Sequence, residues 1–222
     1  MRRIFVLATA VLSGYAIDCN AQLLTDYGVK AAHTSALQTN IRGPISGPNP
    51  NAGPGWLWTI NSVSSVPGLN VAAFAEWFKF PSLSIITQLE YDQRGARYQY
   101  VNPNVVGYSS TEGSLDYLSL PIMGKFKPIS GLLQPYLIAG PRIDYLVSYR
   151  DLQIEPESPA VYANFKRWML GWSTGAGVQA KSILPVDISA EIRHDTDFAN
   201  SYDDGVMRIS NKALDIWLGV SL

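Results

Sequence analysis

The last nine residues, Leu214 to Leu222, alternate in a way that few folds accommodate. Strand side chains point to opposite faces in turn, so the apolar residues of this segment share one face: Leu214, Ile216, Leu218, Val220 and Leu222. An apolar strand edge that is exposed to water aggregates. In a closed membrane barrel, by contrast, lipid covers the apolar face and the first strand pairs with the last. The pattern predicts the closing strand of an outer-membrane barrel.

The first residues have the pattern of an export signal. Arg2 and Arg3 precede an apolar run over residues 4–17, and Cys19-Asn20-Ala21 follows it. The run is shorter than the roughly 20 apolar residues that a membrane-spanning helix needs. We expect residues 1–21 to be a cleaved signal peptide and residues 22–222 to form one barrel domain. Loss of Cys19 leaves a mature chain without disulfide or thiol chemistry.

The composition agrees with a membrane barrel. Hydrophobic residues make up 47% of the chain and charged residues 16%, whereas about 25% charged residues is usual in soluble domains. The formal net charge is -1, which argues against a nucleic-acid partner.

Seven further segments alternate with a period of two, and they predict strands over residues 26–35, 69–80, 83–98, 115–127, 134–150, 166–181 and 186–195. Short turn-forming segments join the second strand to the third, the fourth to the fifth and the sixth to the seventh. The other connections, residues 36–68, 99–114, 151–165 and 196–210, are long for a compact domain. We predict an all-β fold, an eight-stranded antiparallel up-and-down transmembrane barrel with short periplasmic turns and long extracellular loops. The Pro- and Gly-rich residues 36–68 should be extended or mobile.

Several sequence blocks resemble a known family. They are GVKAAHTSA, LNVAAFAEWFKF followed by LSIITQLEYDQRGA, LDYLSLPIMGKFKP, LQPYLIAGPRIDYLVS, and GAGVQAKS before VDISAEIR. Together they resemble the small eight-stranded outer-membrane barrels called PorT-type or porin-like. Two positions depart from that pattern: Ser119, where an acidic residue is frequent, and Leu222, where an aromatic residue is commoner. The resemblance implies a cell-envelope protein of a Gram-negative bacterium, without an established common activity.

The polar faces of the predicted strands carry basic and acidic residues in similar number. An eight-stranded barrel is just wide enough for side chains to fill, and unpaired charges inside it are costly. We therefore predict a structural ionic network in the lumen, formed by Lys30, Glu76, Glu90, Arg94, Lys125, Arg142, Asp144, Asp187, Glu191 and Arg193. The alternative for the same residues is a narrow, porin-like ion pathway.

Two other functional classes, an enzyme and a soluble carrier, are alternatives for this sequence. A lipid A deacylase pairs His with Ser two residues apart on a strand, and His194 with Thr196 has that spacing. The match is poor because Thr replaces Ser and the residue beside it is Asp197 rather than Asn, so an interfacial histidine is the simpler interpretation. A soluble lipocalin-like carrier would place the apolar faces inside and the polar faces outside, which the terminal strand opposes.

The sequence thus predicts an outer-membrane barrel that is not an enzyme and has a structural or binding role through its extracellular loops. A secretion-accessory role is the alternative that the family name suggests. No cofactor or metal is expected, because two isolated histidines make no ligand set. The expected partners are outer-membrane lipid and lipopolysaccharide, the barrel-insertion machinery and an unidentified extracellular ligand or envelope protein.

Overall fold

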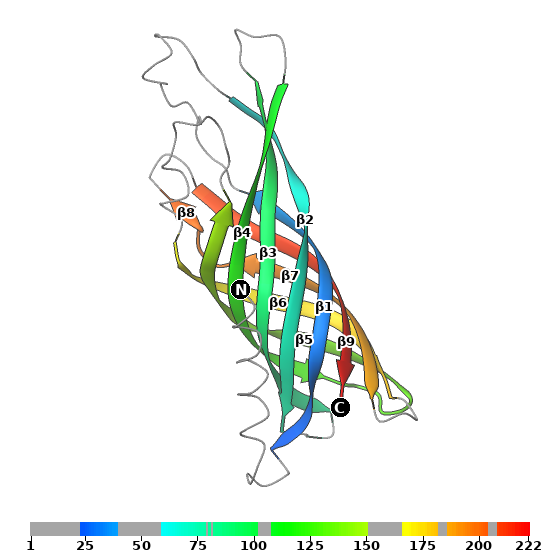
Figure 1. Cartoon of the computed structure of the whole chain (residues 1–222). Helices are drawn as coiled ribbons and strands as arrows, with labels where there is room; N and C mark the ends of the chain where they lie inside the picture. Colours follow the sequence, from blue (N-terminus) through cyan, green and yellow to red (C-terminus); the bar gives the residue numbers. More distant parts are fainter. Residues whose placement is uncertain are drawn as a thin grey trace, which may run out of the picture.

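The computed structural model describes residues 23–39, 59–78, 80, 82–101, 108–150, 166–181, 186–203 and 208–222. The predicted signal peptide lies outside these ranges. The described residues form nine strands (Figure 1): β1 (Leu24–Thr39), β2 (Thr59–Trp77), β3 (Leu83–Val101), β4 (Tyr108–Phe126), β5 (Leu133–Arg150), β6 (Trp168–Ala180), β7 (Asp187–Asp197), β8 (Tyr202–Asp203) and β9 (Arg208–Ser221). Within the described ranges, no helical segment has the length and hydropathy that a membrane-crossing helix needs.

Eight of these strands close into an antiparallel barrel, as the sequence predicted. Neighbours along the chain pair from β1 to β7, β7 pairs with β9, and β9 pairs back with β1. The two-residue β8 pairs with β9 alone, beside the barrel wall. In β9, Ile216 and Leu218 are 54% and 63% exposed, whereas Asp215 and Trp217 are 0% exposed. The period-two pattern therefore separates an apolar outside from a polar and aromatic inside.

The two ends of the barrel differ in how the strands are joined. Figure 1 shows that β9 ends beside the start of β1, at the end where short connections join β2 to β3 and β4 to β5. The Phe78 amide donates to the Leu23 carbonyl oxygen at 3.0 Å, which ties the first of these turns to the start of β1. Residues 40–58, 102–107 and 151–165, which join strands at the opposite end, lie outside the described residues.

Several strands are longer than the sequence analysis predicted. Residues 59–68, predicted as loop, belong to β2, and residues 108–114 belong to β4. The eighth barrel strand begins at Arg208 rather than Leu214. The sequences of the β2 and β4 extensions, TINSVSSVPG and YSSTEGS, have no apolar alternation, so the pattern gave no strand signal there. The connection predicted for residues 36–68 is therefore wrong for residues 36–39 and 59–68, which belong to strands, and its remainder lies outside the described part.

The ladder between β2 and β3 is interrupted near one proline. Pairing stops after Ser65↔Ala96 and resumes at Val71↔Tyr91 with a shifted register. Pro67 lies in this gap, where a residue without an N–H removes no bond to β3. On its other side Pro67 stays paired with Ser35 of β1. Two side-chain amides bridge the gap instead: the Gln93 backbone amide donates to Asn70 Oδ1 at 2.9 Å, and the Leu69 amide donates to Gln93 Oε1 at 3.3 Å. The turn chemistry of Pro67-Gly68 thus marks a break in pairing inside one strand, not the end of a loop.

Candidate functional site

The barrel interior is the candidate site, and at the short-turn end it centres on one carboxylate. Glu76 of β2 accepts bonds from Ser84 Oγ at 2.7 Å, Lys125 Nζ at 2.8 Å and Lys127 Nζ at 2.5 Å. Lys125 also donates to Gln179 Oε1 at 3.1 Å. Strands on opposite sides of the barrel are thereby joined through one buried group.

Gln179 extends this network toward the barrel mouth. Its Nε2 donates to Asp26 Oδ2 at 3.1 Å and to Asp187 Oδ2 at 3.2 Å. Ser221 Oγ, on the last strand, donates to the same Asp26 oxygen at 3.2 Å. A single amide therefore connects β6 with β1 and β7.

The next group up the lumen is a pair between the first strand and the seventh. Lys30 Nζ lies 2.9 Å from Glu191 Oε2, and the Tyr136 hydroxyl donates to the same oxygen at 3.0 Å. The Lys30 ammonium also lies 5.1 Å from the centroid of the Phe74 ring. A buried lysine is stabilised when a carboxylate and an aromatic face replace its water.

Arg193 forms a bidentate ion pair with Glu90 at the centre of the barrel. Its Nη1 and Nη2 donate to Glu90 Oε1 at 2.7 Å and Oε2 at 2.8 Å, and Nη1 also donates to Gln88 Oε1 at 3.0 Å. The guanidinium carbon lies 4.4 Å from the centroid of the Trp217 ring. Paired contacts of this kind fix orientation as well as charge.

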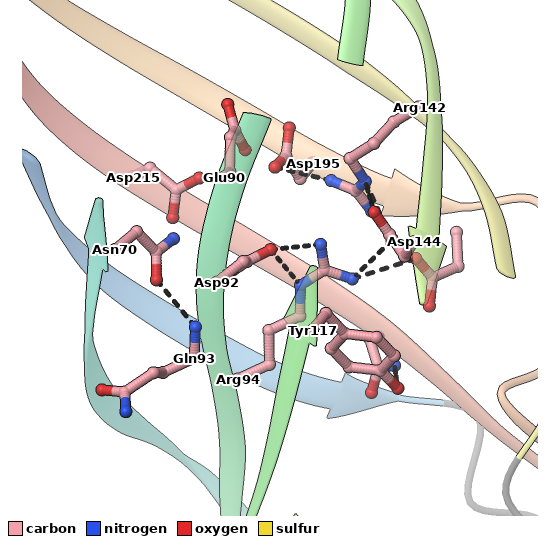
Figure 2. Close-up of polar contacts among 12 residues, drawn as sticks. Asn70, Glu90, Asp92, Gln93, Arg94, Tyr117, Arg142, Asp144, Asp195 and Asp215 are labelled. Carbon is pink, nitrogen blue, oxygen red and sulfur yellow. Dashed lines mark hydrogen bonds and ion pairs between the residues drawn. The ribbon is translucent and has the colours of Figure 1, made fainter. Parts of the chain in front are cut away.

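Above Arg193 the lumen holds two more arginines, which share their carboxylates (Figure 2). Arg94 is bonded to Asp92, with Nε–Oδ2 at 2.8 Å, and its Nη1 donates to Asp144 Oδ2 at 3.0 Å. The same Nη1 lies 3.4 Å from Asp197 Oδ1. The Tyr117 ring centroid lies 4.9 Å from the guanidinium carbon.

Arg142 completes this group from the next strand. Its Nε lies 2.9 Å from Asp144 Oδ1, its Nη1 lies 2.5 Å from Asp195 Oδ2, and its Nη2 donates to Asp197 Oδ1 at 3.0 Å. Asp144 and Asp197 thus each contact both arginines. We call Arg94, Arg142 and Arg193, with the carboxyl groups around them, the arginine–aspartate cluster.

The structure places all ten residues of the predicted network on the inner wall. Nine are buried and Asp187 is half-buried at the short-turn mouth. They fall into separate groups along the lumen rather than one network of ten. Many of their contacts are made with groups absent from the prediction: Asp26, Asp92, Lys127, Gln179, Asp195, Asp197 and Asp215. Asp195 and Asp197 continue the spacing of Glu191 and Arg193. Extending the same period past the predicted strand end would have found Asp197.

Small residues on the inner wall give the large side chains their room. A Cβ at Gly177 would lie 2.5 Å from Cζ of Tyr136, and one at Gly171 would lie 2.9 Å from Nη2 of Arg142. Phe74, Ile86, Met123, Tyr136 and Ile138 form a buried apolar cluster on four adjacent strands. Large buried side chains therefore occupy the lumen at the levels of Tyr136 and Arg142.

The candidate enzyme pair, His194 and Thr196, lies on the outer face of β7, and the nearby carboxyl groups lie on its inner face. His194 is exposed on the outside of the barrel, with Thr196 on the same side of the strand. Glu191, Asp195 and Asp197 point inward and bond to lysine or arginine. Among the described residues, no three His, Cys, Asp or Glu side chains are grouped so as to hold a metal ion. The structure thus places the histidine and these three carboxylates on opposite sides of the wall.

A closed barrel with an apolar outside and an ionic inside is the architecture of outer-membrane proteins. A family model for the outer membrane protein beta-barrel domain matches residues 55–201, well over half of the chain. The chain belongs to this family. No curated protein matches it.

Solved outer-membrane barrels are similar to this chain at low sequence identity. OprG from Pseudomonas aeruginosa is 10% identical, with a TM-score of 0.47 and coverage of 92% of this chain and 98% of that chain. Ail of Yersinia pestis, in complex with the heparin analogue sucrose octasulfate, is 11% identical, with a TM-score of 0.43 and coverage of 89% and 98%. Neisserial surface protein A is 15% identical, with a TM-score of 0.43 and the same coverage. Identities this low transfer no residue's role.

As an outer-membrane barrel, the protein turns its apolar face to lipid, and aromatic side chains lie near both ends of that face. Tyr27 and Phe126 are exposed near the short-turn end. Trp168, Trp172 and Phe198 are exposed toward the other end, where Trp172 and Phe198 have ring centroids 6.4 Å apart. Aromatic girdles of this kind mark the two interfaces of a bilayer. The lipocalin-like alternative is wrong, because it requires the opposite polarity.

Proposed function

We propose that this outer-membrane barrel does not conduct and acts as a structural or binding protein through the long connections at one end. The observation that carries the proposal is the filled interior, in which paired charges and aromatic rings follow one another along the lumen. A cavity of about 450 Å³ at the short-turn end is lined by Asp26, Lys127 and Ser221, among others. Another of about 320 Å³ toward the opposite end is lined by Val66, Gly95 and Arg150, among others. No residue lines both cavities.

If the barrel does not conduct, a planar bilayer that contains it should carry no steady current. Purified protein inserted into a planar membrane should show no steady conductance, because the cluster of Phe74, Ile86, Met123, Tyr136 and Ile138 and the ion pairs above it leave no continuous water path. A wide porin under the same conditions is the positive control. Reproducible open channels, with an ion selectivity that changes in Glu191→Ala, would make the narrow-pore alternative the better account.

The orientation part predicts which positions are reachable from outside the cell. We propose that the short turns face the periplasm and that residues 36–68, 99–114, 151–165 and 196–210 contain the extracellular connections. The predicted mature chain has no thiol, so Asn51→Cys or Ser158→Cys should react with a membrane-impermeant maleimide on intact cells. Ser130→Cys, in the turn between β4 and β5, should react only after the outer membrane is opened. The reverse labelling pattern would refute the topology.

The partners follow from the same proposal. Export would depend on the predicted signal peptide, residues 1–21, and insertion on the barrel-insertion machinery. Outer-membrane lipid and lipopolysaccharide would surround the wall, and an extracellular or envelope protein would bind the long connections. We also propose, from the sequence blocks that carry the resemblance, that the protein is of the PorT type. Crosslinking in intact outer membranes, comparing wild type with a chain shortened within residues 40–58, tests whether that connection holds a partner.

A further inference from the structure

The arginine–aspartate cluster contains more acids than bases. Three guanidinium groups, those of Arg94, Arg142 and Arg193, face six carboxyl groups: Glu90, Asp92, Asp144, Asp195, Asp197 and Asp215. All nine side chains are at most 2% exposed. If all six acids were ionised, the centre of the barrel would hold a large negative excess away from water. Like charges held close together in such a place oppose one another's ionisation.

The arginine donors are unevenly shared, and Asp215 receives least. Both Nη atoms of Arg193 bond to Glu90. Its Nε turns to the space between Asp195 Oδ1, at 3.6 Å, and Asp215 Oδ2, at 3.8 Å, and hydrogen-bonds to neither. Asp195 has Arg142 as a second, closer partner at 2.5 Å. Asp215 is 0% exposed, and the hydrogen-bonding side chain beside it is the neutral hydroxyl of Thr34 rather than a cation.

The charged groups around Asp215 are mostly acidic. The neighbouring strand β7 presents Arg193 directly opposite and Asp195 one inward position further on. Across the lumen, β3 presents Glu90 and Asp92, and the charge of Asp92 acts on Asp215. Figure 2 shows both residues of β3 in the same part of the lumen as Asp215.

The other neighbouring strand brings no free base to Asp215. Thr34 of β1 lies opposite it in the ladder, and the basic residue of that strand, Lys30, is paired with Glu191. A buried carboxylate in this setting would have one neutral hydroxyl and one distant guanidinium as partners and would face several like charges, which is costly. The described carboxyl groups are not arranged to hold a metal ion, so the neutralising group that fits is a proton.

We propose that Asp215 is a proton-binding site, a buried carboxylic acid that keeps its proton at neutral pH and ionises only when the pH is raised. The unfolded chain exposes the same carboxyl to water, where it releases its proton at neutral pH. The folded barrel therefore holds one more proton than the unfolded chain, and its stability falls as the pH rises above the range in which an exposed Asp ionises. Ionisation would add a charge beside Asp195 and loosen the contact between β7 and β9.

Infrared spectroscopy of the folded protein in heavy water tests the assignment directly. Wild type at neutral pH should show the carbonyl band of a protonated carboxylic acid, and Asp215→Asn should lose it. Asp144→Asn is the matched control because Asp144 is equally buried but bonded to two arginines, so the band should remain. If Asp144→Asn does not fold, Asp187→Asn at the mouth serves the same purpose. A wild type without the band, or a band undiminished in Asp215→Asn, would overturn the proposal.

The pH dependence of unfolding gives a second readout. For each pH unit between the ionisation ranges of an exposed Asp and of buried Asp215, the unfolding constant of wild type should rise about tenfold relative to Asp215→Asn, which corresponds to one proton. Near pH 4 the two proteins should be similar, because asparagine imitates the neutral acid. A constant ratio of the two unfolding constants across this range would show that Asp215 is ionised in the folded barrel.

Discussion

Replacing Arg142 with methionine is expected to destabilise the folded barrel by about 3–5 kcal/mol, the usual cost of removing one partner from a buried ion pair. Arg142 is 1% exposed and contacts Asp144, Asp195 and Asp197. Methionine fills much of the space but leaves these carboxylates short of a donor. Urea unfolding of protein refolded into liposomes, followed by tryptophan fluorescence, measures the loss.

The matched control for this substitution is Arg97→Met on β3. Arg97 is also paired with a carboxylate, that of Glu112, but the two side chains are 49% and 51% exposed. Exposed pairs contribute about 0–1 kcal/mol, so this variant should unfold close to wild type. Equal effects of the two substitutions would mean that the interior pairs are as well solvated as the surface pair, contrary to the burial of Arg142.

The second large effect is expected on the lipid face. Ile192→Arg should destabilise the inserted barrel by about 2–4 kcal/mol, the cost of an arginine at the bilayer midplane of such a wall. Ile192 lies at the middle of β7, is 56% exposed on the outside, and is opposite Ala176 and Ile216. Unfolding from liposomes of defined thickness is the measurement.

Depth provides the control for Ile192→Arg. Ile188 is equally exposed but is the second residue of β7, near the short-turn end. Arginine there can reach the interface, so Ile188→Arg should cost only about 0–1 kcal/mol. Ser189→Ala, on the inward side of the same strand, should be mild. If Ile188→Arg and Ile192→Arg were equally tolerated, the outward face would not be in contact with lipid.

The barrel itself could be predicted from the sequence because a period of two is a local property. On β7 and β9, each residue's side of the wall follows from its position relative to its neighbours, and lipid outside with charge inside makes the two sides chemically distinct. The C-terminal alternation from Leu214 to Leu222 thus identified the strand that closes onto β1. The extensions of β2 and β4 escaped prediction because residues 59–68 and 108–114 have no apolar alternation that would signal a strand.

The contacts of the lumen could be predicted only in part. Alternation says that Lys30 and Glu191 both point inward, but their 2.9 Å contact depends on how the strands are staggered around the barrel. The stagger is a property of the whole closed sheet, so it cannot be predicted from the sequence of a single strand. Asp197 was missed for a simpler reason, since strand 7 was predicted to stop at residue 195 and the structure continues it by two residues.

The strands rise to unequal heights, and this decides what an approaching molecule meets first. β2, β3 and β4 have 19 residues each, whereas β7 has 11. β1 accompanies β2 only to Val66, and β5 accompanies β4 only to Ser114. The first residues of β2 and β4 and the last residues of β3 therefore continue as a small sheet that projects from one side of the rim (Figure 1). Six or seven residues at about 3.3 Å each reach roughly 20 Å along the strand. A molecule that approaches this end of the barrel along its axis would therefore meet the ends of β2, β3 and β4 well before it reaches the β7 side of the rim.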